Sequence, residues 1–146
     1  MIWFLRHGDA EDGENDFERK LTKKGEHQSR DAGLALAALG VRFDGCLTSP
    51  KVRALDTARL ACEALGVEVT VEDELQGGPF DARELAAGFD EVLLVGHEPD
   101  FSNAIGELTG GLVDLKKGGI AAVDVRELRV LLRPKETHMI ATVKGS

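Results

Sequence analysis

The sequence predicts an α/β fold, in which helices cover both faces of a mostly parallel central sheet in a three-layer α/β/α sandwich. Short apolar segments alternate with longer segments whose apolar residues recur every three or four positions, the pattern of repeated strand–helix units. Residues 2–5 and 92–95 are apolar throughout, as in strands buried on both faces. No repeat, low-complexity segment or linker interrupts this pattern, so we expect one domain over residues 1–146.

Strands are expected where apolar residues run together or alternate with polar ones. The alternation of valine with polar residues over 67–71 predicts a strand that has one solvent-exposed face and lies near a sheet edge. Together the predicted strands are residues 2–5, 43–48, 67–71 and 92–95. Residues 112–141 are expected to be mainly extended, with a hairpin at Arg126-Glu127, although these are not preferred turn residues.

Capping residues mark the predicted helices. Thr22 is suited to be an N-cap, and Pro50 after Ser49 is a strong signal for a helix start. Gly40 and Gly66 follow the first two helical patterns, as glycines that end helices do. The predicted helices are residues 22–39, 50–65, 81–87 and 99–108, and the polar stretch 9–20 is predicted to be a surface loop.

Composition and charge narrow the classes of function. The net charge is -8 and no basic run exceeds two lysines, so we expect neither nucleic acid nor a membrane as partner. Cys46 and Cys62 lack CxxC spacing, which argues against a disulfide scaffold and for a reducing compartment. No apolar run approaches membrane-spanning length and the N-terminus lacks a secretion signal, so the expected location is the cytoplasm. Nothing in the sequence indicates the oligomeric state.

Chemically active side chains follow three of the predicted strands. Arg6 and His7 follow the first strand, Arg53 lies just after the second, and His97 follows the fourth. Parallel strands place their carboxyl ends at one edge of the sheet, where ligands bind in open α/β folds. We therefore expect these side chains to meet in one crevice, which would be locally positive in an acidic protein.

Two histidines with two arginines suit phosphoryl transfer. Each guanidinium can hold phosphate oxygens in a planar fork and keeps its charge. A neutral imidazole can attack phosphorus and form a covalent intermediate, and nearby Arg6 and Arg53 should lower the pKa of His7. His97, if protonated, would add positive charge beside the phosphoryl oxygens.

Four sequence blocks resemble a known family. They are Arg6-His7-Gly8, Leu21-Thr22-Lys23-Lys24-Gly25, Thr48-Ser49-Pro50-Lys51-Val52-Arg53-Ala54-Leu55-Asp56-Thr57-Ala58 and Leu94-Val95-Gly96-His97-Glu98-Pro99. In this order they resemble the histidine phosphatase (phosphoglycerate-mutase-like) superfamily, over residues 1 to about 110. The short chain and its Arg-His-Gly-Asp-Ala opening resemble the SixA-type phosphohistidine phosphatases. One departure is Asp56, where the family usually has glutamine.

The resemblance implies a role for each matching residue. It implies that His7 accepts the phosphoryl group, that Arg6, Arg53 and His97 bind it, and that no metal or organic cofactor takes part. Larger members carry a glutamate proton donor after the third strand, where this chain has Glu74. Its neighbours Glu72 and Asp73 are less favoured candidates for the same role.

The expected function is a phosphatase acting on protein phosphohistidine, whose imidazole leaving group departs without a strong acid. Three other functions stay open: a phosphatase for small phosphomonoesters, a non-catalytic phosphate- or phosphoprotein-binding module, and a metal-dependent hydrolase using His7, Asp9 and His97. A mutase would need a larger cap than this chain offers. A phosphorylated protein or a small phosphorylated molecule is thus the expected partner.

Single residues also have structural readings. His7 and His97 could be packed strand-end histidines, and Arg53 could merely pair with Asp56 on its helix. Ser102 and Asn103 are expected to cap a helix, and Lys116-Lys117 to form a solvated turn. His27 and His138 are expected to have no role in the site.

Overall fold

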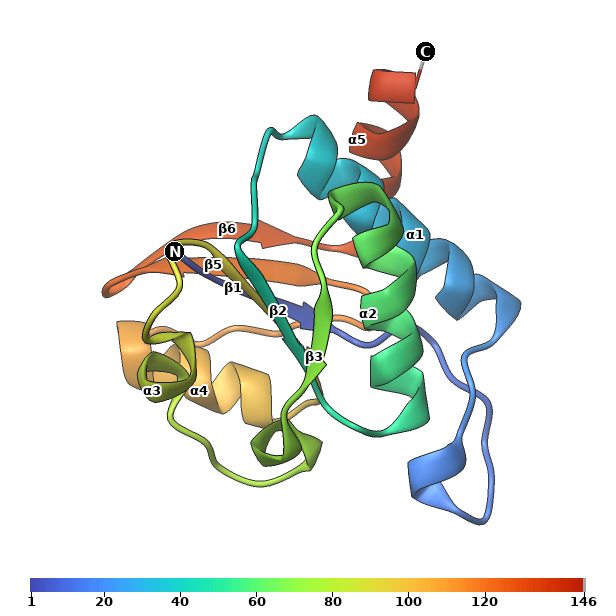
Figure 1. Ribbon diagram of the computed structural model, residues 1–146, viewed down its shortest axis with the longest axis horizontal. Coiled ribbons are helices and arrows are strands. Elements are labelled where there is room, and N and C mark those ends of the chain that lie inside the picture. Colours follow the sequence, from blue (N-terminus) through green and yellow to red (C-terminus); the bar gives the residue numbers. More distant parts are fainter. Residues whose placement is uncertain (146) are drawn as a thin grey trace.

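The computed structural model describes residues 1–145 and confirms the α/β sandwich with a mostly parallel sheet (Figure 1). The described strands are β1 (Ile2–Arg6), β2 (Gly45–Thr48), β3 (Val69–Val71), β4 (Val92–Gly96), β5 (Ile120–Asp124) and β6 (Glu127–Leu132). They form one sheet in the order β3-β2-β4-β1-β5-β6. The first four strands are parallel to one another, and β5 and β6 add an antiparallel hairpin.

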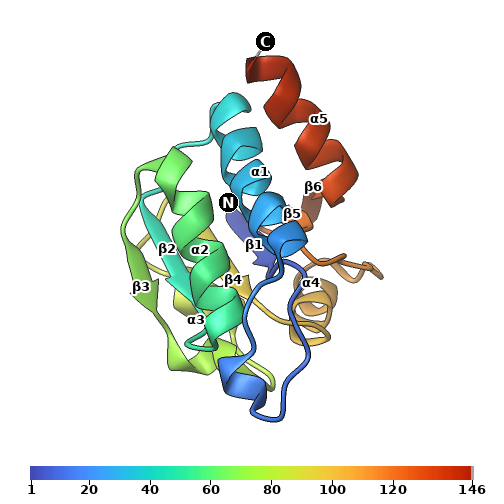
Figure 2. The same ribbon diagram turned by 90° about the vertical axis from the view of Figure 1, so that its right-hand side faces the viewer.

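Helices lie on both faces of this sheet, as expected (Figures 1 and 2). The α-helices are α1 (Lys23–Ala38), α2 (Val52–Leu65), α3 (Ala82–Ala86), α4 (Asp100–Thr109) and α5 (Pro134–Gly145), and the 3-10 helices are η1 (Asp16–Glu18) and η2 (Asp73–Gln76). Helices α1 and α2 cover one face, α3 and α4 cover the other, and α5 lies beside α1. Along residues 1–145, no helix combines the length and apolarity needed to cross a bilayer.

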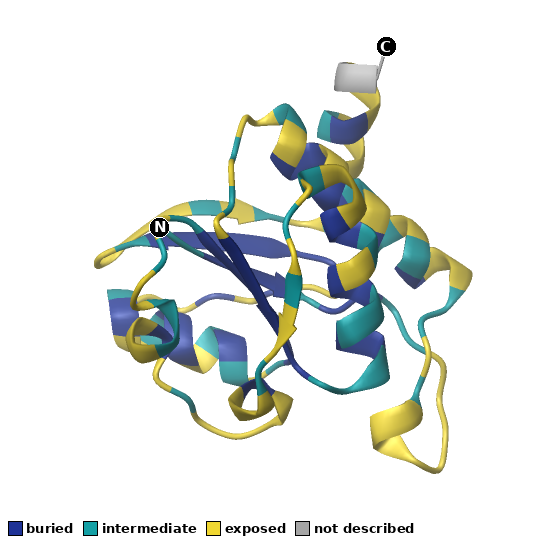
Figure 3. Cartoon of the chain, viewed as in Figure 1, coloured by how far each residue is buried: buried dark blue, intermediate teal, exposed yellow. Residues whose placement is uncertain are grey.

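The central strands are buried because each face packs against a separate apolar cluster. In β1, Trp3 and Leu5 face α1 and α2, while Phe4 faces α4. The Phe4 ring meets the ring of Phe101 edge-on, with 5.2 Å between centroids. Figure 3 shows buried residues running along β1, β2, β4 and β5, whereas β3 at the sheet edge is mostly exposed. The predicted edge position of this strand is thus correct.

The helix signals predicted at Thr22 and Gly66 are present, but the predicted start of the second helix at Pro50 is wrong, because α2 begins at Val52 with Lys51 as its N-cap. The Thr22 side chain accepts a hydrogen bond from the backbone N–H of Gly25 at 3.0 Å, and Gly66 ends α2 in the left-handed conformation. Gly33 lets α1 approach α2 closely, because a Cβ there would lie 2.2 Å from the carbonyl oxygen of Ala61. Hence these two helices pack almost backbone to backbone.

The prediction that residues 112–141 are mainly extended is wrong for the last part of this range, because helix α5 begins at Pro134. The apolar side chains of α5 do not follow a single helical stripe, so the period gave no signal there. Proline at the first helical position was a usable signal, and the Glu136 carboxylate accepts from the backbone N–H of Arg133 at 2.9 Å. The hairpin exists, but its turn is formed by Val125 and Arg126, one residue earlier than predicted.

The packing predicts a large stability loss for Phe4→Ala. Removing a fully buried phenylalanine leaves a cavity, and we expect the free energy of unfolding to fall by about 3–5 kcal/mol. Urea denaturation followed by tryptophan fluorescence measures this change. Leu112→Ala is the matched control, because Leu112 is fully exposed and its loss should stay within about 0.5 kcal/mol. Equal losses in the two variants would contradict the described core.

Candidate active site

The sheet topology gathers the predicted residues at one edge. His7 directly follows β1 and His97 directly follows β4, and these two strands are parallel neighbours. Their imidazole rings lie 5.2 Å apart between centroids. Arg53 lies in the first turn of α2, which follows β2 on the other side of β4. All three side chains are buried, with exposed fractions of 7% for His7 and 6% for both Arg53 and His97.

His7 is held in one tautomer. Its Nδ1 lies 2.7 Å from the carbonyl oxygen of Gly8, and since a carbonyl only accepts, Nδ1 carries the proton. The Nε2 atom is therefore left with a lone pair. Burial lowers the pKa of His7 to about 4, and the charges of Arg53, Arg6 and Lys117 also lower it, against the opposing effect of the Gly8 hydrogen bond. At neutral pH this imidazole is uncharged and has a nucleophilic nitrogen.

His97 is also neutral. Its Nε2 lies 2.8 Å from the hydroxyl oxygen of Ser49. Burial lowers the pKa of His97 to about 3, and His7 (charged only in acid), Arg53 and Lys51 act in the same direction, against the opposing charge of Asp16. The imidazolium considered from the sequence is therefore not the state of this site at neutral pH. Because the Ser49 hydroxyl oxygen already accepts from the backbone N–H of Lys51 at 3.2 Å, we assign the hydroxyl proton to the bond with Nε2 of His97, which leaves an N–H at Nδ1 of His97.

Three donors at this edge have no acceptor. Within residues 1–145, the Nε of Arg6, the Nε of Arg53 and the Nδ1 of His97 are buried without a hydrogen-bond partner. Buried donors are almost always paired, so an unpaired cluster needs an explanation. Two guanidiniums and an imidazole N–H beside a nucleophilic nitrogen match the oxygens of a phosphoryl group. The arrangement can thus bind a tetrahedral oxyanion next to His7.

Two glycines fix the position of His7. A Cβ on Gly8 would lie 2.5 Å from the carbonyl oxygen of Gly25, and one on Gly25 would lie 2.0 Å from that of Asp9. The turn after β1 therefore packs backbone to backbone against the first turn of α1. The backbone N–H of Gly8 also donates to the Thr57 hydroxyl at 3.1 Å, which connects the turn to α2.

Sequence reasoning missed three charged residues at this edge: Asp16, Lys51 and Lys117. Asp16 contacts Arg53, and the charge of Lys51 lowers the pKa of His97. Lys117, expected in a solvated turn, lowers the pKa of His7 and donates to the Asp9 carboxylate at 3.4 Å. The glycine pair after Lys117 was the available signal, because glycines permit close backbone approach and the N–H of Gly118 donates to the carbonyls of Arg6 and His7.

Glu74 is not joined to the histidines. It is exposed on η2, after β3, and none of the interactions described for residues 1–145 links it to His7 or His97. Its neighbour Leu75 is buried and packs near Gly96, so η2 as a whole lies beside the end of β4. Glu74 therefore lies near the site without being part of its hydrogen-bond network.

Other candidates have structural partners. Asp56 pairs with Arg59 at 3.8 Å, while Arg53 pairs with Asp16, so the predicted alternative for Arg53 is wrong. Glu98 accepts from the backbone N–H of Ser102 at 2.7 Å and from its hydroxyl, so here the glutamate caps the helix. His138 is exposed and pairs with Asp31 at 2.9 Å.

The Asp9 carboxylate accepts from the hydroxyl of Thr22 at 2.9 Å and from Lys117. In the described part of the chain, no group of three or more His, Cys, Asp or Glu side chains is placed to hold a metal ion. Among the described residues, His7, Asp9 and His97 thus do not form a cluster that could bind a metal ion.

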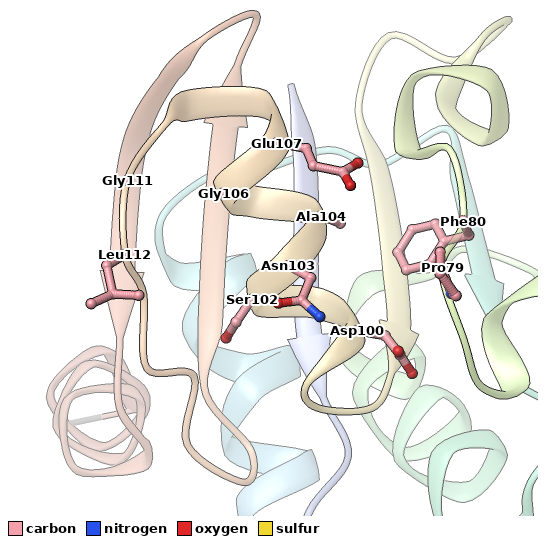
Figure 4. A pocket seen from close by; sticks show the side chains of 10 residues that line it. All are labelled: Pro79, Phe80, Asp100, Ser102, Asn103, Ala104, Gly106, Glu107, Gly111 and Leu112. Atoms are coloured by element: carbon pink, nitrogen blue, oxygen red, sulfur yellow. The ribbon is translucent and has the colours of Figure 1, made fainter.

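A cavity of about 430 Å³ lies along α4, and neither His7 nor His97 is among the residues that line it (Figure 4). Pro79 and Phe80 line one side, and Asp100, Asn103 and Glu107 project from the helix. Two carboxylates make this cavity a poor place for a phosphate ester. The oxyanion site is therefore the edge with His7 and His97.

Comparison with known proteins agrees with this geometry. The model of the histidine phosphatase superfamily (branch 1) matches residues 2–97. An uncharacterised protein of Picosynechococcus sp. is 39% identical over 135 residues, which covers 82% of this chain and 81% of the relative.

Solved structures give the same result. The protein histidine phosphatase SixA complexed with tungstate superimposes with a TM-score of 0.82 at 25% identity, covering 92% of this chain and 97% of that one. The putative phosphohistidine phosphatase SixA from Agrobacterium tumefaciens superimposes with a TM-score of 0.81 at 25% identity, covering 91% of this chain and 97% of that one. The chain therefore belongs to branch 1 of the histidine phosphatase superfamily and is of the SixA type.

Proposed function

We propose that the protein hydrolyses protein phosphohistidine through a covalent phosphohistidine on His7. The observation that carries this proposal is the buried, neutral His7, with Nε2 unprotonated, beside three donors that lack acceptors. Phosphatase chemistry follows from the family, and the substrate and the residue roles are our proposal.

The reaction has two displacements. In the first, Nε2 of His7 attacks phosphorus, and the bond from phosphorus to the substrate nitrogen breaks with its electron pair going to that nitrogen, which leaves as neutral imidazole when the other ring nitrogen carries a proton. In the second, water attacks phosphorus and gives a proton to the solvent, and the electron pair of the bond between phosphorus and Nε2 returns to Nε2. Inorganic phosphate is released and His7 is restored, so no oxidant, reductant or second substrate is needed.

The three donors that lack an acceptor take part in both displacements. Charge develops on the equatorial oxygens, and the Arg6, Arg53 and His97 donors are already positioned to bind them. Removing one donor from a preorganised oxyanion site typically lowers the rate by about 10²–10³-fold. The arginines also balance the charge of an anion in a protein of net charge -8.

Three observations favour phosphohistidine over an alcohol ester. A leaving imidazole has a pKa near about 6.5 and departs without a strong acid, whereas an alkoxide needs a proton donor. The acidic candidate Glu74 is exposed and not hydrogen-bonded to either histidine. The similarity to SixA structures, described as protein histidine phosphatases, supports the same choice.

A small phosphomonoester is the second candidate, favoured by the position of η2 beside the end of β4, from which Glu74 could reach a leaving oxygen. A module that only binds phosphate is less favoured, because binding alone needs no histidine held in a nucleophilic tautomer.

Turnover should produce a transient, acid-labile phosphate on His7. Rapid quench and mass measurement, with a phosphohistidine-bearing protein and a chromogenic phosphomonoester in parallel, would detect it. His7→Ala should abolish both adduct and turnover, while His138→Ala, an exposed histidine elsewhere, should behave as wild type. An adduct that persists in His7→Ala would contradict the proposal.

On the acidic side of the pH profile, kcat/KM should fall with an apparent pKa near 4. Protonated His7 cannot attack, and because its pKa is lowered to about 4, activity should persist through pH 6.5 and fall only as pH approaches 4. The profile is measured after correction for ionisation of the substrate phosphate, with circular dichroism confirming that the protein stays folded. An enzyme titration near 6.5 would show that His7 is not held neutral by burial.

Glu74→Gln separates the two substrate classes. We expect less than about a threefold change with phosphohistidine, since its leaving group needs no acid, against a loss of about 10²-fold or more on an alkyl ester if Glu74 protonates it. Glu68→Gln, another exposed glutamate near β3, is the matched control. A large loss on phosphohistidine itself would contradict an acid-independent first step.

A further inference from the structure

We propose that Asp16 is a positioning residue for Arg53, holding the outer nitrogens of the guanidinium so that Nε remains directed to the phosphoryl group. This inference rests on the proposed function, because it assigns Arg53 to phosphoryl binding. Asp16 belongs to residues 9–20, which the sequence predicts to be a polar surface loop.

Asp16 lies at the tip of an ordered flap, which we define as residues 10–21. An antiparallel bridge between Ala10 and Leu21 closes its base, and the N–H of Glu11 donates to the carbonyl of Lys20 at 2.8 Å. The Arg19 Nε donates across the flap to the carbonyl of Glu11 at 2.8 Å. Figures 1 and 2 both show the flap projecting from the sandwich next to the first turn of α2.

The flap meets α2 through Asp16. Arg53 Nη1 donates to the backbone carbonyl of Asp16 at 2.7 Å, and Arg53 Nη2 lies 3.4 Å from both carboxylate oxygens. Lys51 Nζ contacts the same carboxylate at 3.0 Å and Arg19 Nη1 contacts it at 3.2 Å. The hydrogen bond from Lys51, with further help from Arg19 and Arg53, keeps the pKa of Asp16 far below its usual range. The carboxylate is therefore charged at neutral pH.

The atoms involved argue for positioning and against competition with substrate. Asp16 uses Nη1 and Nη2 of Arg53, whereas the nitrogen without a partner is Nε. Arg6 shows the same pattern, with Nη1 donating to the carbonyl of Leu115 at 3.0 Å and Nε unpaired. Both arginines are thus anchored at the outer end of the guanidinium and offer the inner nitrogen to a ligand.

Anchoring has a physical consequence for binding. A free arginine side chain must lose rotamer freedom when it binds an anion, and a side chain already fixed by the protein does not lose it again. Arg53 is only 6% exposed, so without the Asp16 carboxylate its buried charge would keep the Asp16 backbone carbonyl as acceptor for Nη1 but lose the carboxylate beside Nη2. Loss of the Asp16 carboxylate should therefore weaken phosphoryl binding, and this effect should require the presence of Arg53.

A double-mutant cycle tests this dependence. We would measure kcat/KM and the affinity for inorganic phosphate in wild type, Asp16→Ala, Arg53→Ala and the double variant. Asp16→Ala should lower both by roughly tenfold or more when Arg53 is present and by less than about twofold when it is absent. Asp16→Asn, which keeps the shape of the side chain, should fall between wild type and Asp16→Ala. Asp12→Asn is the matched control, an exposed acid on the same flap.

Two results would overturn the inference. Equal losses in both Arg53 backgrounds would mean that Asp16 only stabilises the flap, and tighter phosphate binding in Asp16→Ala would mean that it competes with the ligand. If Asp16→Ala does not fold, as judged by circular dichroism, the cycle is run with Asp16→Asn. If wild type shows no turnover, the proposed function fails, and the phosphate affinities alone decide the role of Asp16.

Discussion

The parallel pairing of β1 with β4 is the constraint on which the site depends. Arg6 pairs with Gly96, and the backbone N–H of His7 continues the ladder by donating to the carbonyl of Gly96 at 3.0 Å. Two histidines that are 90 positions apart in sequence thereby leave neighbouring strands at the same level. The apolar clusters on both sheet faces stabilise this pairing, so the packing of the core also fixes the positions of the two histidines.

Burial then decides the chemical state of the residues that the sheet brings together. The usual histidine pKa would give a mixed population near pH 6.5, but burial beside guanidiniums keeps both imidazoles neutral. The carbonyl of Gly8 selects which nitrogen of His7 is free. The molecule holds unpaired donors in a buried place, a cost to folding that enzymes commonly accept where a ligand is to be bound.

The sequence predicted much of this arrangement, and the misses have physical reasons. The apolar runs and the N-cap Thr22 located the strands and the first helix near the site, and Pro50 located the second helix to within two residues, because local patterns determine these elements. Helix α5 was missed because its apolar residues lack one helical stripe. Asp16 and Lys117 reach the site through contacts 37 and 108 positions away in sequence, from segments without periodicity. Such contacts depend on loop conformation, which a local pattern does not encode.

We propose that Arg6, Arg53 and His97 hold a phosphoryl group against Nε2 of His7. A crystal structure of the protein with orthovanadate tests it most directly, because this anion adopts the five-coordinate geometry of phosphoryl transfer. We expect vanadium bonded to Nε2 of His7, with its equatorial oxygens within about 3.2 Å of Arg6 Nε, Arg53 Nε and His97 Nδ1. Vanadate bound elsewhere, bonded to Nδ1, or without contact to these donors would contradict it.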